Sequence, residues 1–277
     1  MAVFLAASDE TDCGVNHEGT FFYCGFLAPE QDWANIFTPL WDARVLKGPP
    51  RITEFHVTDL KNKHGCEKNG IDLKEADFRI SEAFGVISAI PSLTPIACEF
   101  NGGHLRTVFE RKVQFSTGAH RRFEPDYLGF FGYVVGVLGR IKHYHPEAQK
   151  VDFVVERNSE ITKRIQEFYV TIPAALVSLG DSGLTNLMGE IIPAGKDCIP
   201  LHAADLLCWY TRRAHLKSLG PKDLERYSVI AKRKGARIIL PDDQLECMYS
   251  ACIEEPNEQE IKRVRDLRPD DGGFFGL

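Results

Sequence analysis

Short apolar runs alternate with longer helical patterns through most of this chain, and they determine its expected fold. Two such runs, residues 2–8 and 20–27, flank a polar, turn-rich segment and predict an antiparallel hairpin. Later runs at residues 93–100, 151–156 and 187–193 predict further strands. Strands that alternate with helices after an initial hairpin indicate an α/β domain with a mixed sheet flanked by helices.

Stretches with apolar residues at helical spacing predict the helices of this domain. They cover residues 29–46, 74–90, 125–143, 159–179, 201–216 and 224–234. Residues 62–72, in contrast, have the composition of a charged loop. We therefore expect one domain over residues 1–218, and a C-terminal extension over residues 219–277 that is partly helical and ends in a loose tail.

The predicted helix at residues 125–143 is unusually rich in glycine. Its glycines recur at positions i, i+3, i+7 and i+10, namely Gly129, Gly132, Gly136 and Gly139. Positions without a side chain allow a neighbouring element to approach the helix backbone closely. The pattern predicts tight packing of this helix.

The composition is that of an ordinary globular protein with an acidic net charge. The chain has 277 residues, 44% of them hydrophobic, which is enough to bury a sizeable core. Its formal charge of −6 argues against a protein that coats nucleic acid non-specifically, although a local basic patch can coexist with an acidic total. No apolar stretch approaches the roughly 20 residues of a membrane span, and the N-terminal apolar run lacks the basic region of a secretory signal. The eight cysteines include no C-x-x-C pair, so we expect a reduced, cytoplasmic protein with no membrane partner.

Four acidic residues at widely separated positions carry most of the functional information. Asp9 and Glu156 follow apolar runs, Asp205 lies inside an apolar helix, and Glu54 lies in a short extended piece. An unpaired carboxylate next to apolar surroundings is costly and needs a cation, a proton or a polar partner. Several such residues in one fold predict a divalent-metal site.

Some of these acids also have structural interpretations. Asp9 suits a turn, and Glu10 would point to the opposite side if the strand continued. Glu54 could equally pair with Arg51 or Lys61 at the surface. A metal site and a set of ordinary turn and surface acids are therefore both open.

The two later acids are more specific. Glu156 could pair with Arg157, and Asp152 competes with it because residues four apart on a strand share a face. We prefer Glu156 because Asp152 lies near the entry to the strand. Asp205 has four helical residues before it, so helix capping does not explain a carboxylate there.

Histidine and arginine residues suggest how a substrate would be held. His202 lies three residues before Asp205 on one helix face, where it could orient water or phosphate, or cap the helix start. His56 follows Glu54 by two residues and would share its side of an extended segment. A basic substrate surface, or simply a solvated face, is indicated by Arg121, Arg122 and Arg212.

Four short motifs carry a resemblance to a known family. They are Asp9-Glu10-Thr11, Glu54-Phe-His56, Val155-Glu156 and Leu201-His-Ala-Ala-Asp-Leu-Leu207. Together they resemble an uncharacterised bacterial domain family of unknown function, which is thought to have a ribonuclease-H-like fold like that of retroviral integrases, transposases and Holliday-junction resolvases. The chain differs from the family pattern where Thr11 replaces Ser, His202 replaces Gln, and Glu156 replaces the commoner Asp.

The resemblance implies a role for each acid. In a ribonuclease-H-like layout the first strand supplies a bridging Asp, an adjacent later strand ends in an acid, and the final helix presents another. Asp9, Glu156 and Asp205 would then hold Mg²⁺ or Mn²⁺, with Glu54 as a possible fourth catalytic acid. Two such ions, about 4 Å apart, neutralise charge on the attacking water and on the leaving oxygen of a phosphodiester.

Three functions are open at this point. The first is a metal-dependent phosphodiesterase or nuclease that acts on DNA or RNA. The second is a non-catalytic, partner-binding module of the same fold in a defence or mobile-element system. The third is a hydrolase of small phosphorylated molecules, which would use the same ligands in a closed pocket.

Overall fold

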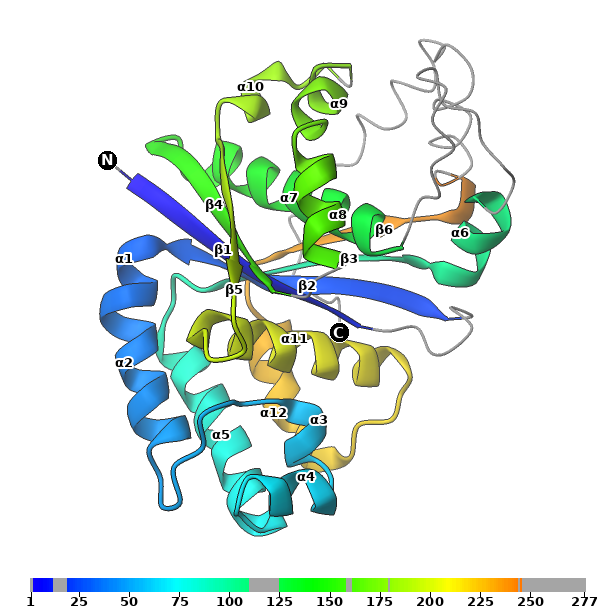
Figure 1. The fold of residues 1–277 in the computed structure, drawn as a ribbon. Helices are drawn as coiled ribbons and strands as arrows, with labels where there is room; N and C mark the ends of the chain where they lie inside the picture. Colours follow the sequence, from blue (N-terminus) through cyan, green and yellow to red (C-terminus); the bar gives the residue numbers. More distant parts are fainter. Residues whose placement is uncertain are drawn as a thin grey trace.

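A mixed β-sheet forms the centre of the protein (Figure 1). The computed structural model describes residues 2–11, 19–109, 125–157, 161–178, 180–243 and 245. In this part of the chain the sheet has six strands in the order β5-β4-β1-β2-β3-β6. The strands are β1 (Ala2–Thr11), β2 (Thr20–Pro29), β3 (Thr94–Asn101), β4 (Ala148–Glu156), β5 (Met188–Ala194) and β6 (Ala236–Leu240). β2 is antiparallel to β1 and β3, and the other neighbours are parallel. The prediction of an α/β fold with a mixed sheet is confirmed.

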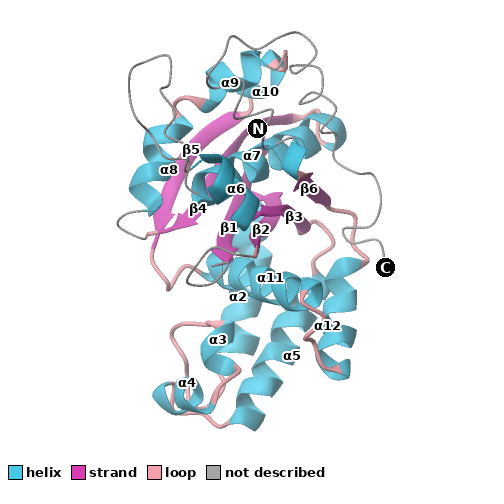
Figure 2. Ribbon diagram, turned by 90° about the vertical axis from the view of Figure 1, so that its right-hand side faces the viewer, coloured by secondary structure: helices cyan, strands magenta, loops and turns pink. Residues whose placement is uncertain are grey.

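Helices cover both faces of the sheet (Figures 1 and 2). On one side lie α1 (Glu30–Asp32), η1 (Trp33–Phe37), α2 (Thr38–Trp41), η2 (Asp42–Leu46), α3 (Val57–Leu60), α4 (Lys63–Lys68), α5 (Leu73–Ala89), α11 (Ile199–His215) and α12 (Pro221–Ala231). On the other side lie α7 (Pro125–Tyr144), α8 (Ile161–Tyr169), α9 (Ile172–Ser178) and α10 (Ser182–Thr185). α6 (Gly102–Phe109) follows β3 directly. The sheet therefore separates two apolar cores, and α11 packs against β1 and β2.

Successive side chains along the parallel neighbours β1 and β4 point alternately into the two cores. Ala7 of β1 and Val154 of β4 face the α11 side, whereas Ala6 and Val155 face the α7 side. Because side chains on a strand alternate with period two, the next residue on the α11 side of β1 is Asp9. The sheet thus delivers particular strand-end residues to the layer that contains α11.

The structure corrects several element boundaries. β1 continues to Thr11, so residues 9–11 belong to a strand and not to a loop. The prediction of a charged loop over residues 62–72 was wrong, because residues 63–68 form α4. Asn62 caps the start of this helix by accepting a hydrogen bond of 2.7 Å from the Gly65 N–H. The helix expected at residues 159–179 is two helices, α8 and α9.

The residues after α11 contain a strand that the sequence did not predict. β6 pairs in parallel with β3 through Ile96 opposite Ala236 and Phe100 opposite Leu240. α12, before it, packs on α5. In residues 219–277, expected to be an extension, the first described elements therefore continue the sheet and one helical layer.

The glycines of α7 allow the close packing that the sequence predicted. A Cβ atom at Gly132 would lie 2.3 Å from Sγ of Cys98 on β3. One at Gly136 would lie 2.2 Å from Cδ1 of Ile238 on β6. Both distances are shorter than van der Waals contact, so α7 lies closer to β3 and β6 than any helix with side chains at these positions could.

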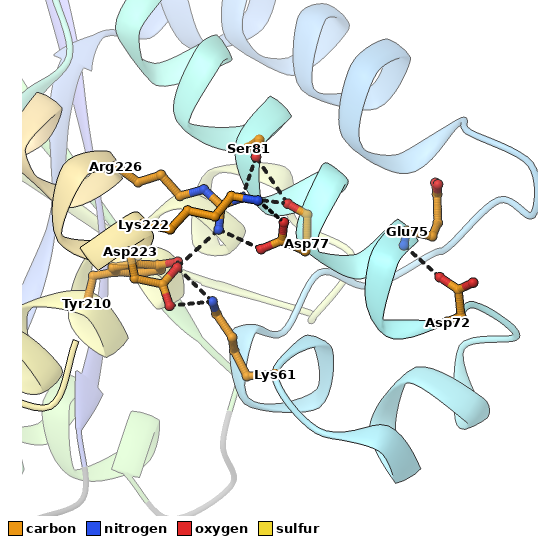
Figure 3. A network of polar contacts seen from close by, with 9 residues as sticks. All are labelled: Lys61, Asp72, Glu75, Asp77, Ser81, Tyr210, Lys222, Asp223 and Arg226. Atoms are coloured by element: carbon orange, nitrogen blue, oxygen red, sulfur yellow. Dashed lines mark hydrogen bonds and ion pairs between the residues drawn. The ribbon is translucent and has the colours of Figure 1, made fainter. Parts of the chain in front are cut away.

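A network of ion pairs joins α12 to α5 and to the end of α3 (Figure 3). Arg226 donates to Oδ1 of Asp77 at 2.7 Å and also contacts Asp223. Lys61 donates to both carboxylate oxygens of Asp223, at 2.8 and 2.7 Å, and Tyr210 donates to one of them at 2.7 Å. The network fixes the end of α3 relative to α11.

Two further sequence expectations concern cysteines and membranes. The five cysteines with described surroundings, Cys24, Cys66, Cys98, Cys198 and Cys208, are all free.

Among the described residues, no helix combines the length and the apolar character needed to cross a membrane.

Candidate functional site

A cleft of about 600 Å³ opens where the ends of β1 and β4 meet α11 and the segment before α3. All four acids singled out in the sequence line it, although they come from different parts of the chain. Its walls include Asp9, Glu10, Phe21, Glu54, Phe55, His56, Thr58, Asp59, Lys68, Glu156, Lys196, Leu201, His202, Asp205, Cys208, Trp209 and Arg212. The fold therefore gathers the predicted residues at one place.

Strand register places two of these acids side by side. β1 and β4 are parallel neighbours, with Ser8 opposite Val155. One residue further along each strand are Asp9 and Glu156, which both point toward α11 because of the strand alternation. Neighbouring strands lie about 4.8 Å apart, so these two carboxylates share the same end of the sheet.

Asp205 reaches the cleft from α11. Its Oδ2 accepts a hydrogen bond of 2.7 Å from the backbone N–H of Val57, the first residue of α3. Its Oδ1 lies 3.6 Å from Nε2 of His56, and the side chain is 17% exposed. The carboxylate is thus oriented by the segment on the opposite wall.

The acids interact electrostatically across the cleft. Burial raises the pKa of Asp9 well above its usual range, and the negative charges of Asp205 and Glu156 raise it further. Burial also raises the pKa of Asp205 to about 7, against the opposing hydrogen bond from Val57 and with a further contribution from Glu156. The cleft therefore holds carboxylates that disfavour each other's ionised form.

Lys196 brings a positive charge to this group. Its Nζ lies 3.8 Å from Oε1 of Glu156, and its charge opposes the rise in pKa at both Asp9 and Asp205. Lys196, which is exposed in the turn between β5 and α11, was not among the residues expected from the sequence. Its position just before the helix that carries Asp205 was the available signal.

His202 contacts the turn that contains Lys196. It is 3% exposed, and its Nε2 lies 2.7 Å from the carbonyl oxygen of Lys196. A carbonyl only accepts, so Nε2 carries the proton, and burial lowers the pKa of the imidazole. His202 is therefore a neutral residue that holds the turn before α11 and also lines the cleft. It does not cap the start of α11, where Cys198 is the N-cap residue and no side chain makes a capping hydrogen bond.

The segment before α3 contributes further polar side chains. Glu54 is exposed and faces the cleft, and the surface pairs considered for it are made differently: Arg51 contacts Asp42, and Lys61 contacts Asp223. Asp59, which the sequence analysis did not consider, lies 3.5 Å from Nδ1 of His56.

The remaining candidates fall into three groups. Arg212 lines the cleft, whereas Arg121 and Arg122 lie outside the described residues. Glu10 lines the cleft as well. Asp152 is not among the cleft residues: it accepts from the Glu190 N–H at 2.8 Å and pairs with Lys150.

The donor set suits a hard divalent cation. Asp9, Glu156 and Asp205 offer carboxylate oxygens, which Mg²⁺ and Mn²⁺ prefer. A cation between them would offset the burial and the negative charges that raise the pKa values of Asp9 and Asp205. Within the described ranges, no three His, Cys, Asp or Glu side chains already stand in a metal-ligating arrangement.

Comparison with known proteins found no matching family model, no matching curated protein and no matching solved structure.

Proposed function

We propose that this protein is a divalent-metal-dependent phosphodiester hydrolase that acts on nucleic acid, with Asp9, Glu156 and Asp205 as ligands of Mg²⁺ or Mn²⁺. The observation that carries the proposal is the convergence of these three acids, from two strand ends and one helix, on a single cleft. This arrangement supports the ribonuclease-H-like layout that the sequence motifs suggest: first strand, adjacent parallel strand and a late helix.

Each group in the cleft would have a different role in this reaction. The ions would supply charge neutralisation and water activation. In the ribonuclease-H-like layout Asp9, on the first strand, would be the bridging ligand. Burial raises its pKa, and the charges of Asp205 and Glu156 raise it further. Asp205 is oriented by the Val57 N–H, and Lys196 and Arg212 provide positive charge toward a phosphate. Glu54 stays a possible fourth acid.

One observation each favours the two alternatives. A partner-binding module without catalysis fits the absence, among the described residues, of side chains already arranged around a metal. A hydrolase of small phosphorylated molecules fits the cleft volume of about 600 Å³, which is typical of small-ligand sites. The convergence of the carboxylates favours a metal enzyme over a partner-binding module. The basic residues beside the carboxylates favour a nucleic-acid substrate over a small phosphorylated molecule.

The test is cleavage of single- and double-stranded DNA and RNA by purified protein with Mn²⁺ or Mg²⁺. Bis(p-nitrophenyl) phosphate serves as a small phosphodiester, and EDTA as the metal-free control. Asp9→Asn and Asp205→Asn test the cleft, and Glu225→Gln removes an exposed carboxylate of α12 that does not line it.

The proposal expects cleavage of a nucleic acid that needs the metal, is lost in Asp9→Asn and Asp205→Asn, and persists in Glu225→Gln. Hydrolysis of the small diester without cleavage of any nucleic acid would favour the small-molecule alternative. No cleavage together with no calorimetric Mn²⁺ binding would contradict the proposal and leave the binding module.

A further inference from the structure

The face of α11 that borders the cleft carries three kinds of side chain in a fixed order. Asp205, Trp209 and Arg212 follow one another at spacings of four and three residues, so they lie on one face of the helix. Four residues of α-helix advance about 6 Å along the axis. An indole ring thus lies one helical turn beyond the carboxylate, and a guanidinium one turn further.

Trp209 differs from the other tryptophans of the chain. Trp33 and Trp41 are 3% and 0% exposed, and both belong to the core beneath the sheet. Trp209 is only partly buried and forms part of the cleft wall. Part of its ring packs against the core on the α11 side, and the rest is an apolar contact surface at the wall of a polar cleft.

Two cationic side chains lie over this ring. Nζ of Lys61 lies 5.6 Å from the ring centroid, and the guanidinium carbon of Arg213 lies 5.2 Å from it. Lys61 is itself fixed by both carboxylate oxygens of Asp223 (Figure 3), so its ammonium is held beside the indole. The ring of Tyr210 packs edge-on against the indole of Trp209, with the two ring centroids 4.9 Å apart.

Charge is distributed unevenly along the cleft. Asp9, Glu10 and Glu156 line it at the ends of β1 and β4, and Asp205 faces them from α11. Arg212 lines it beyond Trp209 on the same helix, and Lys68 is a further basic residue of the wall. Arg213, next to the indole, is exposed. An anionic chain with planar rings matches this order: phosphates contact the basic side chains, one ring contacts the indole, and one phosphate reaches the acids and their metal.

We propose that Trp209 is a stacking platform for a nucleobase beside the carboxylate cluster, and that the ligand of the cleft is therefore single-stranded nucleic acid. This inference rests on the proposed function and specifies its substrate. In a duplex each base is covered by its neighbours, so a protein ring stacks on a base only where the strand is single or the base is displaced. Stacking is tolerant of sequence because every base has an aromatic face.

The experiment measures binding in EDTA, where cleavage does not occur. Fluorescence anisotropy of labelled oligothymidine, oligouridine and a DNA duplex of the same length gives affinities for the wild type, Trp209→Leu and Trp209→Phe. The matched control is Tyr144→Leu, which removes another exposed aromatic ring that stacks with an arginine, Arg140, on the α7 side of the sheet. Circular dichroism melting checks that each variant folds.

The inference expects the wild type to prefer single strands over the duplex. Trp209→Leu should bind them about tenfold more weakly or worse, Trp209→Phe should retain part of the affinity, and Tyr144→Leu should match the wild type. Comparison of oligothymidine with oligouridine tells DNA from RNA. Equal binding of the duplex, or wild-type affinity in folded Trp209→Leu, would overturn the inference.

This outcome can be told apart from failure of the proposed function. Binding that depends on Trp209 without any metal-dependent cleavage would keep the stacking site and remove the hydrolase. Cleavage of nucleic acid by Trp209→Leu with unchanged kcat and KM would keep the hydrolase and remove the stacking site.

Discussion

The backbone N–H of Val57 donates a hydrogen bond of 2.7 Å to Oδ2 of Asp205, across 148 residues of sequence. Val57 begins α3, and the first N–H groups of a helix have no partner inside it. The bond therefore satisfies a helix terminus and orients a largely buried carboxylate at the same time. It also brings His56 and Asp59 to the wall that faces α11.

Metal binding at this carboxylate should depend on pH. The pKa of Asp205 is raised to about 7, so a proton competes with the ion at acidic pH. We expect Mn²⁺ affinity to fall roughly tenfold from pH 8 to pH 6, with proton release on binding. Calorimetry at both pH values, in buffers of different ionisation enthalpy, measures both effects. Asp205→Asn should lose binding and Glu225→Gln should keep it, and an affinity independent of pH would count against Asp205 as a ligand.

Lys196 should act on metal and substrate in opposite directions. Its ammonium lies 3.8 Å from Glu156, where it would repel a cation but attract a phosphate. Because the side chain is largely exposed, we expect Lys196→Met to strengthen Mn²⁺ binding by only about two- to fivefold while weakening nucleic-acid cleavage. Calorimetry and cleavage rates test the two effects, with Lys74→Met as an exposed control outside the cleft. Weaker Mn²⁺ binding in Lys196→Met would contradict this assignment.

The acids of the cleft could be anticipated for a physical reason. Asp9 and Glu156 follow apolar runs and Asp205 interrupts one, so each conflicts with its surroundings in a way that the sequence displays. Lys196 and Asp59 show no such conflict, because a charged residue in an exposed turn or short helix is ordinary. Their role depends on how distant segments meet, which periodicity does not encode.

The same distinction applies to the fold. Strands buried on both faces, such as β2 and β4, have apolar runs that mark them, and the glycines of α7 marked its close contact. α4 has six residues and starts from an asparagine cap, too short for a periodic pattern. β6 alternates buried and exposed residues over only five positions, which a short sequence window does not separate from a loop.

Close packing of α7 on the sheet predicts a sharp effect of one methyl group. A Cβ at Gly132 would lie 2.3 Å from Sγ of buried Cys98, so Gly132→Ala should lower the free energy of unfolding by about 1–3 kcal/mol. A Cβ at Gly220 meets no atom within 4 Å, so Gly220→Ala should change it by about 0.5 kcal/mol or less. Urea unfolding followed by circular dichroism compares the two. Equal effects would mean that α7 does not lie as close to β3 as described.

The ion-pair network of α12 and α5 should make stability depend on pH in acid. Arg226 hydrogen-bonds to Asp77 and thereby holds the pKa of that carboxyl well below its usual range. For Asp223, burial raises the pKa, but hydrogen bonds led by that from Lys61 outweigh it and lower the pKa overall. A carboxyl with a depressed pKa in the folded state stabilises the fold above its unfolded pKa of about 4, and this contribution is lost as pH falls toward the folded value.

Replacement of Arg226 tests this dependence against a matched arginine. Arg226→Met should lower the free energy of unfolding by about 2 kcal/mol at pH 7, because it leaves Asp77 with Lys222 as its remaining side-chain cation and removes a partner of Asp223, and by less at pH 3. Arg233 donates only to backbone carbonyls, those of Ile87, Ser88, Ile90 and Leu93, which do not titrate. Arg233→Met should therefore destabilise the protein equally at both pH values. Urea unfolding at pH 7 and pH 3 measures the difference, and a pH-independent cost for Arg226→Met would show that packing of its side chain, and not its charge, joins α12 to α5.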